Sequence, residues 1–172
     1  MSAQNEGLFS EESLTAAAEK FLETLSRKWQ LPAQTFAGGP CLIDFGGGNI
    51  LALYPQLEGL RSLIMHTQIG VIPLRTPAAG QFQLEALEAN NAWSRTQGAT
   101  LGIDGEDGSV GLWQRFVLPA ASEEEITDAV TAFLGTAEFW RDILKSRGGQ
   151  PAYLDQSSPA DAGADFQNFV KA

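Results

Sequence analysis

The stretch from Leu84 to Leu118 constrains the fold of this chain more than any other part of its sequence. A helical pattern is closed by Gly98, and two short apolar runs follow, separated by the turn-forming residues 105–108. A glycine that closes a helix, followed by a tight polar connection between apolar runs, predicts a helix that leads into a β-hairpin. A further amphipathic helical pattern, 126–144, comes next. No residue set with recognisable chemistry occurs here, which favours a protein-binding surface over an active site.

The preceding part of the chain predicts one helix and three strands. A helical stripe that ends before Pro32 is formed by Leu14, Ala18, Phe21, Leu25 and Trp29. Two apolar runs, 41–45 and 50–54, flank the glycine-rich residues 46–49, which predict a hairpin turn. A third run, 63–69, alternates between apolar and polar residues and predicts a half-exposed strand.

The second helix, which begins at Thr76-Pro77, has two apolar sides. One side carries Phe82, Ala86, Ala89 and Trp93. The opposite side carries Leu84, Leu87 and Asn91. A helix with two apolar sides packs against two neighbours, and the second neighbour is either more of this chain or a partner subunit.

The last predicted helix completes an α+β domain with the order α-β-β-β-α-β-β-α, in which helices flank a twisted antiparallel sheet. Ser122 and Glu125 form a capping box at the start of this helix. Its apolar stripe consists of Ile126, Val130, Phe133, Ala137, Trp140 and Leu144. The domain is predicted to span residues 1–147, with its core in 11–147. Residues 148–172 are rich in Gly, Pro, Ser, Ala and Asp and predict a flexible tail, although its apolar residues leave docking open.

Composition excludes several classes of partner. The net charge of -10 repels phosphate backbones and anionic lipid, so neither nucleic acid nor a membrane is an expected partner. The single cysteine, Cys41, cannot form an internal disulfide and suits a reducing compartment. The N-terminus lacks the pattern of a secretory signal, and no apolar run has the length of a membrane span. We therefore expect a cytoplasmic protein.

The sequence offers no candidate for catalysis, for metal binding or for a cofactor. His66 is the only histidine and falls on the polar side of its predicted strand. No Cys/His spacing suits a metal, and the acidic residues Asp104, Glu106 and Asp107 lack the ligand pattern of a calcium loop. The glycines at 46–48 are not followed by a lysine and a helix, as a phosphate-binding loop requires.

Several short strings occur in a characteristic order along the chain. They are Leu31-Pro32, Leu42-Ile43-Asp44, Leu87-Glu88-Ala89-Asn90, the segment from Gly98 to Asp104, Leu112, Leu118-Pro119, Phe133-Leu134 and Ala137-Glu138-Phe139-Trp140. Together with the element order, they resemble the class I type III secretion chaperones, the Tir-chaperone-like (CesT/SycE-type) family. The resemblance covers about residues 11–147. A smaller residue than usual at Ala92, the absence of a glycine at Gln97 and the long tail depart from the family pattern.

The resemblance implies a homodimer in the bacterial cytoplasm that binds the N-terminal region of a secreted effector in extended form. It implies that the chaperone keeps the effector soluble and delivers it for export, with the secretion ATPase or other apparatus components as further candidate partners. It also implies that the second helix and the last two strands build the dimer contact. The first helix and first strands would then offer grooves and a sheet edge to the effector.

These implications assign roles to particular residues. The predicted dimer interface contains Leu84, Leu87, Asn91, Leu101, Ile103 and Trp113. The predicted effector-binding residues are Leu25, Trp29, Phe36, Leu42, Ile43, Leu51 and Leu53. Some of the second set must be core, because the run 50–54 is apolar on both faces, and the dimer set could equally fill the core of a monomer.

Two alternative functions remain at this point. The first is a regulator or adaptor that shares the fold and binds a partner that is not exported. The second is a small-molecule enzyme with an unfamiliar site, which would require a pocket with convergent polar groups.

Overall fold

The computed structural model describes residues 11–36, 39–56, 61–120 and 122–152. The helices are α1 (Glu11–Trp29), α2 (Pro77–Ala92) and α3 (Glu123–Ser146). The strands are β1 (Cys41–Asp44), β2 (Ile50–Gln56), β3 (Ser62–Val71), β4 (Thr100–Ile103), β5 (Ser109–Val117) and β6 (Gln150–Pro151). The predicted α+β order is confirmed, and β6 is an addition to it.

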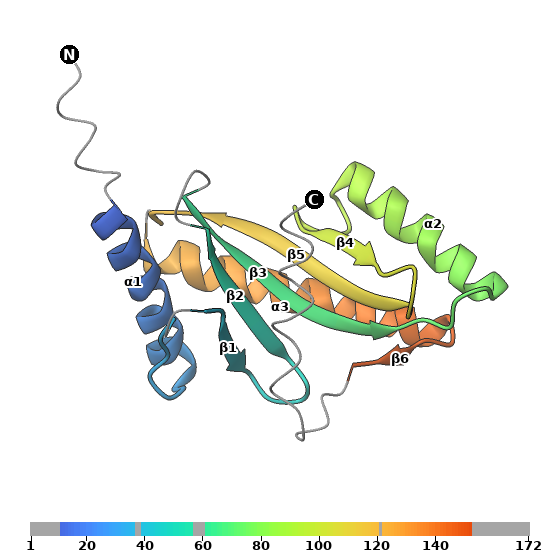
Figure 1. The fold of residues 1–172 in the computed structure, drawn as a ribbon, viewed down its shortest axis with the longest axis horizontal. Coiled ribbons are helices and arrows are strands. Elements are labelled where there is room, and N and C mark those ends of the chain that lie inside the picture. The colour runs from blue at the N-terminus through green and yellow to red at the C-terminus, as the bar shows by residue number, and fades with distance from the viewer. Residues whose placement is uncertain (1–10, 37–38, 57–60, 121, 153–172) are drawn as a thin grey trace, which may run out of the picture.

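The sheet is antiparallel, in the order β1-β2-β3-β5-β4, and β6 pairs with β3 outside that path. Figure 1 shows α3 running behind the sheet, α1 at the end near β1, and α2 at the opposite end beside β4. The sheet therefore has an inner face toward the helices and an outer face turned away from them. β1 and β4 are its edge strands.

The core lies between the inner face and the helices. The Phe21 ring of α1 meets the Phe116 ring of β5 edge-on at 5.0 Å. At the other end, the Phe82 ring of α2 meets the buried Trp140 of α3 at 5.9 Å. Burial of each such side chain contributes on the order of 2 kcal/mol. The first contact holds α1 against the inner face of the sheet, and the second holds α2 against α3.

The helix starts match the predicted caps. The Thr76 hydroxyl accepts a hydrogen bond from the Ala79 N–H at 3.1 Å, and the Ser122 hydroxyl accepts one from the Glu125 N–H at 3.0 Å.

The prediction that Trp93 lies on the buried side of α2 is wrong. This residue caps the C-terminus of α2 in the left-handed conformation, with φ 52°, so the chain turns before Trp93 reaches the buried side of the helix. Its side chain is 63% exposed.

Regular structure is described beyond residue 147, where the tail was predicted to begin. β6 pairs with the end of β3, Gly70 opposite Pro151, and the Ala152 N–H donates to the Ile69 carbonyl at 3.2 Å. A Cβ on Gly70 would lie 2.3 Å from the Gln150 carbonyl oxygen, so only glycine admits β6 at this position. The rest of the predicted tail, residues 153–172, lies outside the described part of the chain.

The side chain of Asn90 covers the outer edge of β4. Its amide nitrogen donates to the Leu101 carbonyl at 2.9 Å, and its oxygen accepts from the Leu101 N–H at 2.8 Å. The Asn90 amide thus replaces a neighbouring strand at this position. It also fixes α2 to the sheet.

We expect Asn90→Ala to lower the free energy of unfolding by about 2 kcal/mol, because it leaves two backbone groups of an edge strand without their partner. Hydrogen exchange of the Leu101 amide should accelerate in the same variant. Asn91→Ala, the same change at the next and exposed position, is the control and should leave that amide protected. Equal exchange in the two variants would show that the Asn90 side chain does not protect β4.

Candidate protein-binding surfaces

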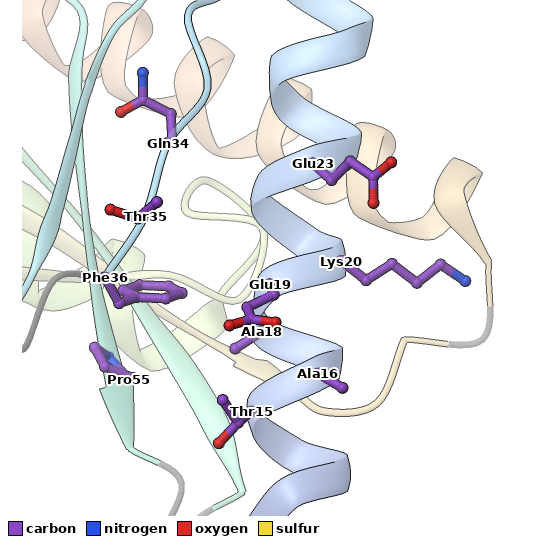
Figure 2. A pocket seen from close by; sticks show the side chains of 10 residues that line it. All are labelled: Thr15, Ala16, Ala18, Glu19, Lys20, Glu23, Gln34, Thr35, Phe36 and Pro55. Carbon is purple, nitrogen blue, oxygen red and sulfur yellow. The ribbon is translucent and has the colours of Figure 1, made fainter.

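An open cavity of about 760 Å³ lies between α1 and the segment that follows it. Figure 2 shows Phe36 and Pro55 facing α1 across this cavity. Thr15, Ala18 and Glu19 lie on the side of the helix that faces them. The complete lining is Thr15, Ala16, Ala18, Glu19, Lys20, Glu23, Gln34, Thr35, Phe36 and Pro55. The apolar floor and charged rim suit a peptide side chain better than a reacting small molecule.

Strand β1 begins five residues after Phe36, the last cavity-lining residue of the segment that follows α1. Among the described strands, β1 pairs only with β2, so one side of its backbone has no strand partner there. The Cys41 thiol donates to the Gln34 side-chain oxygen at 3.6 Å, which links the strand to the cavity wall. Burial raises the pKa of this thiol, so Cys41 is a packing residue rather than a nucleophile.

The structure divides the predicted effector-binding residues into three groups. Leu25, Ile43, Leu51 and Leu53 are buried in the core, so the prediction that they form a binding surface does not fit this structure. Their side chains point to the inner face, which α1 and α3 cover. Trp29 and Phe36 are half-buried against the core, and Trp29 packs edge-on against Phe45 at 5.3 Å. Leu42 is 41% exposed.

The predicted dimer residues divide in a similar way. Leu84 and Leu87 are 63% and 65% exposed on α2, and Asn91 is exposed on the same side of the helix. Leu101 is buried in the core of the single chain, which contradicts its assignment to a subunit surface. Ile103 and Trp113 are half-buried. The remaining candidate contact is therefore centred on the exposed side of α2.

A row of side chains crosses the outer face of the sheet. The pairing register places Leu42, Ala52, His66, Trp113 and Thr100 side by side on β1, β2, β3, β5 and β4. The His66 and Trp113 rings stack at 4.7 Å with 25° between their planes.

Trp113 lies flat over two glycines of the neighbouring row. A Cβ on Gly111 or Gly102 would come within 2.3 Å or 2.7 Å of its indole ring. His66 was predicted only to lie on the polar side of its strand, and this stack was not predicted. The pair of glycines near a tryptophan was a signal for a ring lying against the sheet.

Neither a metal site nor a membrane span is found in the described ranges. No group of three or more His, Cys, Asp or Glu side chains within them could hold a metal ion. No helix in those ranges has the length and apolar character to cross a membrane.

The stacked His66 should make stability depend on pH. Burial lowers its pKa from 6.5 to about 4, so the folded chain favours the neutral ring. The unfolded chain binds the proton more readily, and stability is lost as the pH falls from 6.5 toward 4, by about 3 kcal/mol at most. We expect chemical denaturation of His66→Phe, which keeps a stacking ring, to lack this part of the pH dependence. Identical pH profiles for the two proteins would contradict the assignment.

Solved structures share this fold. The chain in the ExsC-ExsE complex is 21% identical, with a TM-score of 0.62, over 76% of this chain and 96% of that one. The HopA1-SchA chaperone-effector complex contains a chain that is 17% identical, with a TM-score of 0.57, over 74% and 95% of the two chains. The ExoU-SpcU complex from the type III secretion system of Pseudomonas aeruginosa contains a chain that is 16% identical, with a TM-score of 0.56. The match covers 74% of this chain and 98% of that one.

A comparison with curated proteins found no significant match. The sequence nevertheless matches the Tir chaperone protein (CesT) family over residues 20–141, which is more than half of the chain and runs from α1 into α3. The resemblance drawn from the short sequence strings is therefore confirmed at the level of the family. This chain belongs to the Tir chaperone protein (CesT) family.

Proposed function

We propose that this protein is a type III secretion chaperone that acts without catalysis in the bacterial cytoplasm. It binds the N-terminal region of an exported effector in extended form, keeps that region soluble and delivers it for export. The observation that carries the proposal is the family match over residues 20–141, which include the β1 edge and most of the cavity beside α1. The chaperone-effector complex of SchA and HopA1, which has the same fold, supports it.

The β1 edge and the cavity suit an extended segment. A strand added to β1 gains main-chain hydrogen bonds that do not depend on the effector's sequence. Alternate side chains of that strand point to the two faces of the sheet. Those on the inner side approach the cavity around Phe36, and those on the outer side approach Leu42. Because β1 has only four residues, the edge alone gives few hydrogen bonds, and the apolar contacts must add affinity.

The homodimer is part of the proposal and rests on α2. Two leucines that are more than 60% exposed on one side of a helix form an apolar surface that a second copy would cover. The opposite side of α2 is fixed within the monomer, through Phe82 in the core and through an ion pair between Glu85 and Arg147. The exposed side is thus held in place for contact. The net charge of -10 favours solubility of the unpaired chains.

Thr15→Arg should fill the cavity and weaken effector capture at least tenfold, because its side chain enters the space between α1 and Phe36. Thr15 is exposed, so the fold should be retained. The measurement is affinity capture from the native host under secretion-inducing conditions, followed by identification of bound exported proteins and mapping of their binding segments.

Thr131→Arg introduces the same side chain on the exposed surface of α3 and is the matched control. It should capture the effector as the unmodified protein does. Capture that is equal in all three proteins would remove the cavity from the binding site. Capture of apparatus proteins alone, with no exported client, would favour the regulator alternative.

Leu87→Asp should convert the dimer to a folded monomer. The substituted position is exposed in the single chain, so the monomer pays no cost, whereas a subunit contact would bury an unpaired carboxylate. Sedimentation and circular dichroism would report mass and folding together. Gln81→Asp, at an exposed α2 residue about a third of a turn away from Leu87, is the control and should remain dimeric. A Leu87→Asp protein that stays dimeric would move the contact away from α2.

A further inference from the structure

The cavity beside α1 has one acidic wall and one neutral wall. The charged residues of its lining all belong to α1 and are Glu19, Lys20 and Glu23. The opposite wall consists of residues 34–36 and Pro55, which carry no charge. Figure 2 shows Glu19 on the side of α1 that faces this neutral wall, whereas the Lys20 side chain extends away from it. The helix therefore presents negative charge to a ligand in the cavity.

Glu23 extends this acidic rim by one helical turn. Residues four apart in an α-helix lie on the same side of it, about 6 Å apart along the axis. Figure 2 shows the Glu23 carboxylate turned outward, away from Phe36, at the outer end of the rim. Glu19 and Glu23 are both exposed, and like charges at this spacing repel each other. A cation bound between the two carboxylates would relieve that repulsion.

Neither rim carboxylate takes part in an ion pair within the described ranges. The ion pairs found there join Arg27 to Glu123 and Arg147 to Glu85. Arg27 stands one further turn along α1 from Glu23, on the same side of the helix, but its guanidinium is engaged with α3. The negative charge of the rim is therefore available to a ligand.

An extended segment on β1 would meet the floor and the rim of the cavity with alternate residues. Side chains two positions apart on a strand point to the same face and lie about 7 Å apart. This spacing is close to the axial separation of Glu19 and Glu23, which is about 6 Å. When an apolar side chain fills the floor beside Phe36, the side chain two positions away reaches the acidic rim.

We propose that the cavity beside α1 selects effector segments in which an arginine or lysine lies two positions from an apolar residue. The apolar side chain occupies the floor formed by Ala18, Phe36 and Pro55, and the cation lies over Glu19 and Glu23. The inference rests on the proposed function, because it takes an extended effector segment as the ligand. It adds to that function a preference for charge that an apolar floor alone does not provide.

Peptide display against the full chain tests the proposal. The probe is a library of random short peptides, selected for binding to the unmodified protein and then depleted of those that also bind Thr15→Arg, whose cavity is filled. We expect arginine or lysine two positions from an apolar residue to be enriched severalfold over the unselected library. With the protein carrying Glu19→Lys and Glu23→Lys, the same position should favour aspartate or glutamate.

Asp128→Lys with Asp142→Lys is the matched control, because it changes the net charge equally on the exposed side of α3. This protein should retain the preference for basic peptides. For one selected peptide, Glu19→Gln with Glu23→Gln should raise the dissociation constant about fivefold, since each exposed ion pair contributes little. The difference should shrink at high salt, which screens exposed charges. All four substituted positions are exposed, so the fold should be retained.

The outcomes separate this inference from the proposed function. Peptides that bind in the cavity without a charge preference would overturn the inference and leave effector binding there intact. A basic preference that persists with Glu19→Lys and Glu23→Lys would also overturn it, because the charge of the whole chain would then be its source. If no peptide distinguished the unmodified protein from Thr15→Arg, both the inference and the place of the cavity in effector binding would be overturned.

Discussion

The pairing of β3 with three other strands is the constraint on which the rest of this structure depends. β3 lies between β2 and β5 along most of its length and accepts β6 at its end. Its inner side chains, Leu63, Met65 and Ile69, support the packing of α1 and α3. Its outer side chain His66 anchors the aromatic row. Because side chains alternate across a strand, a shift of one residue in this register would exchange the two faces and remove both surfaces together.

The asymmetry between the two faces explains why so much of this chain can be devoted to binding. The buried rings of Phe21, Phe82, Phe133 and Trp140 all lie on the inner side, between the sheet and the helices. The stability of the domain therefore comes from one layer of contacts. The β1 edge and the exposed side of α2 can therefore bind other chains without loss of the core.

The sequence predicted the elements better than it predicted which residues are exposed. Periodicity and turn residues identify the three helices and the first five strands, because these signals are local. Leu51 and Leu53 could not be separated from surface residues, since the run 50–54 is apolar on both faces and the order of neighbouring strands decides which face is covered. β6 was missed because two residues that include a proline carry no periodic signal. The stack of His66 on Trp113 depends on a pairing between distant strands, which no local pattern contains.

The β1 edge and the outer face of the sheet meet at one residue, Leu42. It begins the outer-face row that continues through Ala52 to His66, and it also lies on the edge strand β1. A strand added to that edge would extend the same row by one position, because paired strands share their faces. The cavity beside α1 lies on the inner side of the sheet, so an effector strand on β1 would direct alternate side chains toward the cavity and toward the outer face beside Leu42. Leu42, which is 41% exposed where the edge meets the outer face, is therefore the outer-face side chain that an added effector strand would contact first.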